Sequence, residues 1–568
     1  MKIALVPLNP TVGHIAHNNR LATNHIDRAI ALECDLIIFP ELSLIGYPPK
    51  DYLFYKQLIE EQNQSLVRLR RKSKKIAIIT GGVTLNRGIG APFKNTAFIM
   101  INGQQHVYTK QLLPNYDVFD ESRYFEAGTE PLVLKIGGKK FGLSVCEDIW
   151  SYEKDTKKRY RINPVEGYKN QALDFFVNIA ASPFELDKLT RRKELLYRVA
   201  DDLDCTVVFV NQSGGNDDLV FDGGALVVGP ARQTLFQSPL FEDNVFVYDT
   251  GSPVNGGVDQ VTHLTLTRSN SSILRGVHPH SVDCDIPTYP DNRMALLLKA
   301  LITGTRDYCH KTGFKQVVLG LSGGVDSALT AFIASQALGA ENVLGVMLPS
   351  RYSSKGSLTD AKKLARNLQM AVQPLEINTI HKALEKTLRQ IFKKNVSDIT
   401  AQNIQARIRA VILMAIANNT NRLLLNTSNK SEAAMGYGTL YGDMCGALAV
   451  IGDLTKTQIY ELCRHINRER EIIPAEIINK APSAELKPNQ KDTDSLPPYP
   501  VLDPIVEDFI DRFVINKKNT GSNFTATEIV QKILANEYKR YQAPPCLKVT
   551  GKAFGTGRRM PIAAKVTS

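Results

Sequence analysis

A glycine-rich loop in the second half of the chain has the residue types that bind phosphate. The loop, SGGVDS (322–327), joins an apolar run at Val317–Leu321 to a helix-like stretch at Ala328–Leu338. Glycines let backbone N–H groups approach an anion, and the following helix presents its positive end to the same point. Asp326 makes sense beside phosphate if a cation such as Mg²⁺ lies between them, although a structural turn capped by Asp326 is the alternative. The loop lacks the lysine of a Walker loop.

Three reactive residues in the first half each follow an apolar run. Glu41 lies in IIFPELSLIGYPP, Lys110 in HVYTKQLLPNYDVFDE and Cys146 in FGLSVCEDIW. Residues at the ends of separate strands can converge on one edge of a sheet. A thiol, a carboxylate and an ammonium would then supply the nucleophile, the base and the oxyanion partner for amide hydrolysis through a thioester. Taken singly, Cys146 is also compatible with a core position, and Glu41 and Lys110 with a surface pair.

The elements that must position these residues alternate between strands and helices, which predicts an α/β fold. In the first half, β-branched runs such as KIALVPL, DLIIFP and DFFVNIA end in turn residues. The pattern weakens around 250–291 and restarts with a helical stretch at Met294–His310. The second half then alternates QVVLGLS, NVLGVMLPS and NRLLLNTSN with helical stretches, which predicts a parallel sheet covered on both faces. The proline-rich segment 484–500 is predicted to be a loop over a site.

Bulk properties restrict the class of protein further. The 568 residues are too many for one core and predict two or three domains. No run approaches the roughly 18 apolar residues of a membrane span, and the N-terminus lacks a signal-peptide core, so a cytoplasmic location without a membrane partner is expected. The eight cysteines form no C-x-x-C pair, which argues against zinc ribbons. The net charge of +12 and the basic tail after Glu537 are compatible with nucleic acid or with anionic small molecules.

The loop and the three front residues each resemble a known superfamily. SGGVDS resembles the loop of the ATP pyrophosphatases, which split ATP between the α and β phosphates. The segments around Glu41, Lys110 and Cys146 resemble the nitrilase superfamily over roughly residues 1–265, specifically its glutaminase branch. Together the halves resemble the glutamine-dependent NAD synthetase family over nearly the whole chain. The resemblance implies a nitrilase-like αββα sandwich at 1–265, a linker at 266–290 and a parallel-sheet synthetase domain at 291–568.

The resemblance also implies roles for residues that match the family's motifs. Glu41, Lys110 and Cys146 are the implied catalytic residues, and the implied glutamine-binding residues are Tyr116, Ser182 and Lys188. The implied ATP-binding residues are Gly320, Leu321, Ser322, Gly323, Gly324, Val325, Asp326, Ser327 and Thr427, with Lys456 and Ser483 as further matches. Asn403, Glu432 and Lys539 are the implied deamido-NAD contacts, and Asp326 and Glu432 the implied Mg²⁺ ligands. One departure is Leu440, which stands where ammonia-dependent relatives carry a lysine that touches substrate.

The implied reaction uses ATP, glutamine and deamido-NAD as substrates and Mg²⁺ as cofactor, with a homodimer formed through the synthetase domain. Three other functions are less consistent with the sequence. A tRNA-modifying enzyme has only the basic tail in its favour, and no RNA module accompanies it. Other amidotransferases carry different glutaminases, with an N-terminal cysteine or another nucleophile context, whereas Cys146 is internal. A non-catalytic scaffold is disfavoured because the reactive residues are intact.

Overall fold

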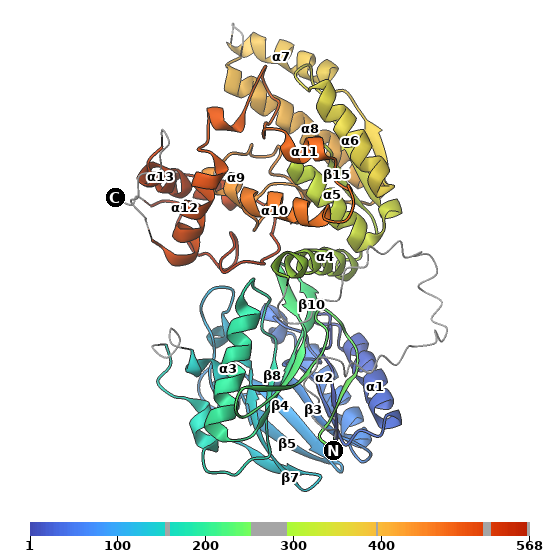
Figure 1. The fold of residues 1–568 in the computed structure, drawn as a ribbon, viewed down its shortest axis with the longest axis vertical. Helices are drawn as coiled ribbons and strands as arrows, with labels where there is room; N and C mark the ends of the chain where they lie inside the picture. The colour runs from blue at the N-terminus through green and yellow to red at the C-terminus, as the bar shows by residue number, and fades with distance from the viewer. Residues whose placement is uncertain (154–158, 252–291, 393–395, 515–523, 565–568) are drawn as a thin grey trace. The chain divides into compact units, whose positions relative to one another are not determined.

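The computed structural model describes residues 1–153, 159–251, 292–392, 396–514 and 524–564. Contacts divide the chain into two units, Met1–Asn216 with Val220–Leu296, and Asp217–Leu219 with Leu297–Ser568. The predicted boundary at 265 and linker at 266–290 lie outside the described residues. Within the described ranges, no helix is long and apolar enough to cross a membrane. Figure 1 colours the chain by residue number, from blue at the N-terminus to red at the C-terminus.

The first unit is built on two six-stranded sheets. One has the strand order β14(Phe246–Asp249), β1(Lys2–Leu5), β2(Leu36–Ile38), β3(Ala77–Leu85), β4(Phe93–Ile101), β5(Gln104–Thr109). The other has the order β13(Gln233–Gln237), β12(Ala225–Gly229), β9(Thr206–Asn211), β8(Phe175–Ala180), β7(Lys139–Val145), β6(Val133–Ile136). Strands β10(Ser213–Asn216) and β11(Leu219–Asp222) form a separate pair.

Successive side chains along each strand point to opposite faces of the sheet, which explains why the sheets pack into layers. In β1, Ile3 and Leu5 join the core shared with the second sheet, whereas Ala4 faces a second core. That second core contains side chains of α1(Ile15–Ala31) and α2(Lys56–Lys72), so these helices cover the outer face of the first sheet. Helix α3(Lys188–Leu203) packs on β9 and β12 of the second sheet. Figure 1 shows the resulting layers, and the predicted αββα sandwich is confirmed.

The second unit has one five-stranded parallel sheet, which confirms the predicted class. Its order is β17(Ala371–Pro374), β16(Val343–Met347), β15(Val317–Gly320), β18(Leu423–Asn426), β19(Leu448–Ala449). The first strand in sequence, β15, is central, so the winding direction reverses between β15 and β18. In open α/β sheets, ligands bind at the carboxyl ends of the strands beside such a reversal.

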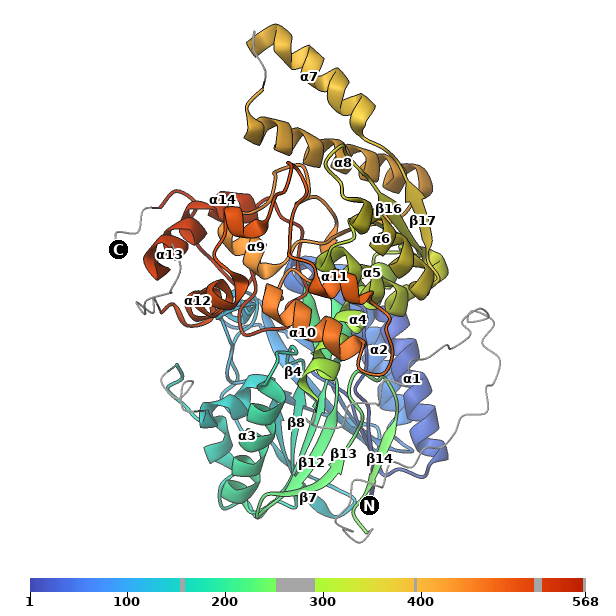
Figure 2. The same cartoon turned by 45° about the horizontal axis from the view of Figure 1, so that its top comes forward.

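Helices cover both faces of this sheet. In Figure 2, β16 and β17 lie between α8(Asp398–Thr420) and the pair α5(Val325–Leu338) and α6(Lys355–Leu368). Val318, Val346 and Leu424 share a buried cluster with side chains of α8. The remaining helices are α4(Arg293–Lys311), α7(Asn378–Phe392), α9(Lys430–Met435), α10(Lys456–Ile466), α11(Ala475–Asn479), α12(Tyr499–Arg512), α13(Ala526–Ala535) and α14(Glu537–Arg540). Short 3-10 turns occupy η1(Lys50–Phe54), η2(Glu121–Arg123), η3(Cys146–Tyr152), η4(Pro164–Tyr168), η5(Ala340–Asn342) and η6(Asp492–Asp494).

Two element boundaries differ from the sequence-based expectation. Helix α5 begins at Val325 rather than Ala328, because Gly324 takes the extended N-cap conformation and the helix starts directly after it. Asp326 and Ser327 therefore lie in the first helical turn. The loop predicted over 484–500 ends at Tyr499, where α12 begins with a proline in its first turn, a position that proline favours.

Candidate active sites

The front site is organised by the buried ammonium of Lys110. Glu41 follows β2, Lys110 follows β5, and both side chains are completely buried. The Lys110 Nζ donates to Glu41 Oε1 at 2.8 Å and to Glu121 Oε1 at 2.9 Å. Burial opposes the charge on Lys110, but the two carboxylates outweigh it and hold its pKa well above the usual value. The site therefore contains a permanent cation.

The two carboxylates around Lys110 have different surroundings. Glu41 also accepts from Asn95 Nδ2 at 2.7 Å and from the Ala181 backbone N–H at 2.8 Å. Glu121 accepts from the Tyr47 hydroxyl at 2.8 Å, and burial raises its pKa to about 7 against the opposing effect of Lys110. Glu41 is thus fixed on both carboxylate oxygens. Glu121 is the second carboxyl group on the same ammonium.

Cys146 lies where β7 gives way to the turn η3. Its φ of +44° is in the left-handed region, which costs a non-glycine residue roughly 1 kcal/mol or more and is typical of functional sites. Burial, followed by the charge of Glu41, raises the pKa of the thiol well above its usual value, while Lys110 lowers it. A thiol with a raised pKa needs a base to become a thiolate, and the carboxylate of Glu41 is its main charged neighbour.

The two acids that follow Cys146 have separate functions in the structure. Asp148 is completely buried and accepts from the backbone N–H groups of Gln111, Leu112 and Val145 at 2.9 Å each. It thus ties the segment after β5, which carries Lys110, to the segment after β7, which carries Cys146. Glu147 accepts instead from the hydroxyls of Tyr116 at 2.9 Å and Tyr160 at 2.8 Å.

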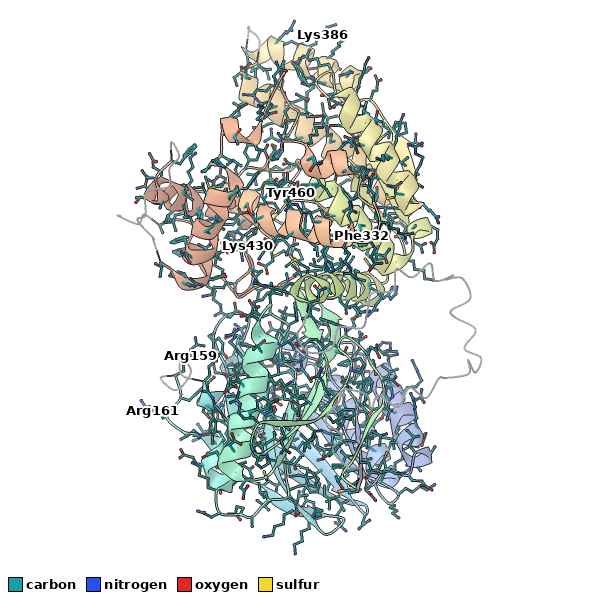
Figure 3. All side chains as sticks on the ribbon, in the orientation of Figure 1. Arg159, Arg161, Phe332, Lys386, Lys430 and Tyr460 are labelled. Carbon is teal, nitrogen blue, oxygen red and sulfur yellow. The ribbon has the colours of Figure 1, made fainter. Side chains whose placement is uncertain are left out.

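The residues predicted to bind glutamine lie around Glu147 and Glu41. Tyr116 contacts Glu147 directly, and Arg159, labelled in Figure 3, lies 3.9 Å from the centre of the Tyr116 ring. Lys188, at the start of α3, lowers the pKa of Glu147 through its charge, although burial has the larger and opposite effect. Ser182 follows the residue whose N–H binds Glu41, and its hydroxyl accepts from Arg192 at 3.3 Å.

The phosphate loop of the second unit follows β15 at the reversal point. Ser322 Oγ accepts from the Gly324 N–H at 3.2 Å and lies 3.0 Å from Ser327 Oγ, which tightens the loop. Gly323 has φ +81°, and a Cβ there would lie 2.2 Å from the carbonyl oxygen of Ser357. Glycine is therefore required at 323 by both conformation and space. The first turn of α5 then presents its backbone N–H groups as an anion site.

A cavity of about 290 Å³ opens beside this loop. The predicted residues that line it are Gly320, Leu321, Ser322, Gly324, Val325, Asp326, Ser327, Thr427, Glu432, Lys456 and Ser483. Gly323 does not line it, because it packs against the start of α6. Tyr460 of α10, labelled in Figure 3, lines it as well.

The two predicted metal ligands meet at one point of this cavity. Lys456 Nζ donates to Asp326 Oδ2 at 2.6 Å and to Glu432 Oε1 at 3.2 Å. Asn429 Nδ2 donates to the other oxygen, Asp326 Oδ1, at 2.8 Å. Burial raises the pKa of Glu432, whereas the carboxylates hold the pKa of Lys456 above its usual value despite burial.

This donor set fits Mg²⁺ that arrives with phosphate. Two carboxylates converge on a common cation beside a phosphate loop, and Mg²⁺ commonly takes one or two carboxylates plus phosphate oxygens and water. Across the described ranges, no group of three or more His, Cys, Asp or Glu side chains forms a metal site. The pair therefore suits a metal shared with a nucleotide rather than one held by protein alone.

The side chains of the other two predicted deamido-NAD contacts do not line the cavity themselves but hold a segment that contributes Tyr437 to its wall. Asn403 of α8 accepts from the Thr439 hydroxyl at 2.9 Å. Lys539 Nζ of α14 donates to the carbonyls of Gly436 at 2.7 Å and Gly438 at 2.9 Å. Both side chains thus hold the 436–440 segment, which leads to Gly442 and Asp443 on the cavity wall. The departure at Leu440 also lies in this segment, and Arg407 Nε donates to its carbonyl at 3.1 Å.

Several cavity residues were missed by the sequence analysis. Arg409 lines the cavity with its Nε bonded to the Leu348 carbonyl at 3.0 Å, and burial lowers its pKa to about 10. Glu485, from the segment predicted to lie over the site, accepts from the hydroxyls of Ser354 at 2.9 Å and Ser357 at 2.7 Å. These contacts tie that segment to the N-terminus of α6. No motif marked Arg409, whereas Glu485 lies in the PSAEL stretch beside Ser483.

Comparisons with known proteins match the two halves of the chain to two different families. Residues 2–251 match the carbon-nitrogen hydrolase family, and residues 297–543 match the NAD synthase family. The glutamine-dependent NAD(+) synthetase of Synechocystis sp. is 41% identical over 573 residues, covering 99% of this chain and 98% of that protein.

Two solved structures cover the same length. The glutamine-dependent NAD+ synthetase of Acinetobacter baumannii, in complex with ADP, is 34% identical with a TM-score of 0.74 over 99% of this chain and 98% of that one. The enzyme of the same name from Cytophaga hutchinsonii has a TM-score of 0.80 over 99% and 98% of the two chains, and at 20% identity this likeness concerns the fold. The chain belongs to the family of glutamine-dependent NAD(+) synthetases.

Proposed function

We propose that the chain is a carbon-nitrogen ligase that amidates deamido-NAD to NAD⁺, with glutamine as nitrogen donor. ATP is split to AMP and pyrophosphate, and glutamate is the remaining product. One observation supports the proposal most strongly: a single chain contains both the buried Glu41–Lys110–Cys146 site and a cavity beside a phosphate loop. Full-length family membership supports it.

In the front unit, Glu41 takes the proton of the Cys146 thiol and the sulfur attacks the side-chain carbonyl carbon of glutamine. The oxyanion that forms lies against the Lys110 ammonium, which its pairing with Glu121 and Glu41 keeps charged despite burial. Glu41 returns the proton to the leaving nitrogen, the C–N bond breaks and ammonia departs. Water, deprotonated by Glu41, then hydrolyses the thioester to glutamate and restores the thiol.

Recognition of glutamine is assigned to the groups around Glu147. The substrate carries an α-ammonium and an α-carboxylate. Glu147 offers a carboxylate for the first, and Lys188 offers an ammonium for the second. Tyr116 orients Glu147, and Ser182 completes the binding wall.

In the second unit, a nicotinate carboxylate oxygen of deamido-NAD attacks the α phosphorus of ATP, and pyrophosphate leaves into the 320–327 loop. Ammonia made at Cys146 then attacks the activated carbonyl, and AMP departs as NAD⁺ forms. Asp326 and Glu432 would hold Mg²⁺, which supplies positive charge to the phosphates. Thr427, Lys456 and Ser483 line the cavity for ATP. Deamido-NAD binds along the 436–440 segment held by Asn403 and Lys539, with Arg407 as the cation beside Leu440.

The two activities are assigned to residues 1–265 and 291–568, with 266–290 as linker.

A homodimer through the synthetase unit is proposed because α7 and α8 expose several apolar side chains to solvent: Ile380, Ile391, Phe392, Ile399 and Val411. Light scattering should give twice the 63.0 kDa chain mass, and a monomer at micromolar concentration would contradict the dimer. The proposed location is the cytoplasm, where ATP is available for the reaction.

The proposed chemistry predicts the nucleotide products. With ATP, Mg²⁺, glutamine and deamido-NAD, the protein should form NAD⁺, AMP and pyrophosphate in equal amounts, because the phosphate loop retains pyrophosphate rather than transferring a terminal phosphoryl group. Chromatography of the nucleotides and a pyrophosphate assay measure the ratio. ADP formed in proportion to NAD⁺ would exclude the mechanism.

Replacement of Cys146 should separate the two activities. Cys146→Ala should lower glutamine-dependent synthesis at least about 10³-fold, since no thioester can form, yet retain synthesis with ammonium at mildly alkaline pH. Asp326→Asn should lose synthesis with either nitrogen source, because both need the adenylate. Cys205→Ala, which removes another buried thiol, is the matched control and should retain both. Glutamine-dependent activity in Cys146→Ala, or loss of both activities in the folded variant, would refute the two-site assignment.

Substitution of Glu121 should change the rate of the glutamine reaction only. Glu121→Gln preserves an acceptor for Lys110 and Tyr47 but removes one of the two charges that hold the ammonium, so we expect glutamine hydrolysis to fall by about tenfold or more. Ammonium-dependent synthesis should stay unchanged. Glu130→Gln, at an exposed carboxylate nearby in the chain, serves as the control. Steady-state assays with each nitrogen source decide between this result and a general loss of structure, which would lower both rates.

A further inference from the structure

The ammonium of Lys456 occupies the point where the metal is proposed to bind. The side chain is 2% exposed, and its Nζ lies 2.6 Å from Asp326 Oδ2 and 3.2 Å from Glu432 Oε1. These three residues come from the starts of three different helices, α10, α5 and α9. Their convergence therefore depends on the tertiary structure, and the lysine neutralises two carboxylates that would otherwise repel one another.

Lys456 takes the carboxylate oxygen that a metal would need. On Asp326, Oδ1 already accepts from Asn429 Nδ2 at 2.8 Å, so Oδ2 is the oxygen aimed at a cation, and Lys456 binds it. Mg²⁺ requires its ligand oxygens at about 2.0–2.1 Å in near-octahedral geometry. An ammonium hydrogen-bonded to the same oxygen fills that space and repels a second cation. Lys456 and Mg²⁺ are thus alternatives at this carboxylate pair.

The ammonium of Lys456 has an alternative binding partner within reach. The backbone of Lys456 is fixed, because its N–H donates to Ser431 Oγ at 2.9 Å at the start of α10. Beyond it, the four-carbon side chain is flexible, and both Lys456 and the phosphate loop line the same cavity. Phosphate oxygens in that cavity would accept the ammonium as it leaves the carboxylates.

We propose that Lys456 is a resident counter-ion of the metal site, which holds Asp326 and Glu432 in the nucleotide-free protein and releases them to Mg²⁺ only when ATP phosphates accept its ammonium. Metal binding thereby depends on nucleotide binding. The inference rests on the proposed function, since it takes Asp326 and Glu432 as the metal ligands.

Mn²⁺ binding without nucleotide tests this directly. Free Mn²⁺ is measured by electron paramagnetic resonance in wild type and in Lys456→Met, with and without α,β-methylene-ATP. Lys456→Met should bind Mn²⁺ alone at least about tenfold more tightly than wild type, and Mn²⁺ alone should raise its Tm but not that of wild type. The gain should disappear in Lys456→Met/Asp326→Asn. The matched control is Lys363→Met, whose ammonium also lies between two carboxylates, Glu471 at 2.7 Å and Glu476 at 3.4 Å, at a place that does not line the cavity, and it should bind Mn²⁺ as wild type does.

The outcomes separate the inference from its premise. Equal Mn²⁺ affinity of wild type and Lys456→Met without nucleotide would overturn the counter-ion role, and so would a gain that survives Asp326→Asn. Mn²⁺ binding that stays unchanged by Asp326→Asn in the presence of the ATP analogue would remove the metal assignment itself. The wild-type measurement alone is decisive if the variant does not fold, because tight binding of Mn²⁺ without nucleotide contradicts the proposal. Lys456→Gln then provides the second uncharged variant.

Discussion

Each unit contains a buried ammonium that is held between two carboxylates and on which its proposed site depends. Lys110 bridges Glu41 and Glu121 in the first unit, and Lys456 bridges Asp326 and Glu432 in the second. Removing such charges from water costs several kcal/mol per ion, so none of these groups is tolerated there alone. Each lysine balances two carboxylates, which are buried in the first unit and partly exposed in the second, and each site depends on that charge balance.

Sheet topology brings these charges together. In the first unit, Glu41, Lys110 and Cys146 follow β2, β5 and β7, and Asp148 ties the last two segments together through backbone N–H groups. In the second, the reversal between β15 and β18 opens the crevice in which the phosphate loop and Thr427 face one cavity. In the first unit these residues therefore come from two sheets, β2 and β5 of one and β7 of the other, rather than from the single sheet edge that the sequence suggested, whereas in the second unit they follow strands of one sheet.

This dependence on strand ends explains how much the sequence could predict. Glu41, Lys110, Cys146 and the 320–327 loop directly follow apolar runs, so the strands that precede them and the outline of both sites were predictable. Glu121 lies in a 3-10 turn eleven residues after Lys110, and Arg409 lies inside a helix, where no strand end marks them. The contact of Lys456 with Asp326 spans 130 residues and requires the placement of three helices. Asn403 and Lys539 act through the 436–440 segment, an arrangement that no spacing reveals.

The two lysine sites differ in enclosure, and the difference matches the chemistry assigned to each. Lys110 and Glu41 are 0% exposed and Glu121 is 4% exposed, so the first ammonium has no exit and remains as a fixed charge. Asp326 and Glu432 are each 19% exposed and line the nucleotide cavity, so their lysine has both an open side and incoming phosphates to accept it. An oxyanion that forms and collapses within one turnover requires a cation already in place. A nucleotide that brings its own metal requires a site whose resident charge can leave, and only the second lysine lies beside such an opening.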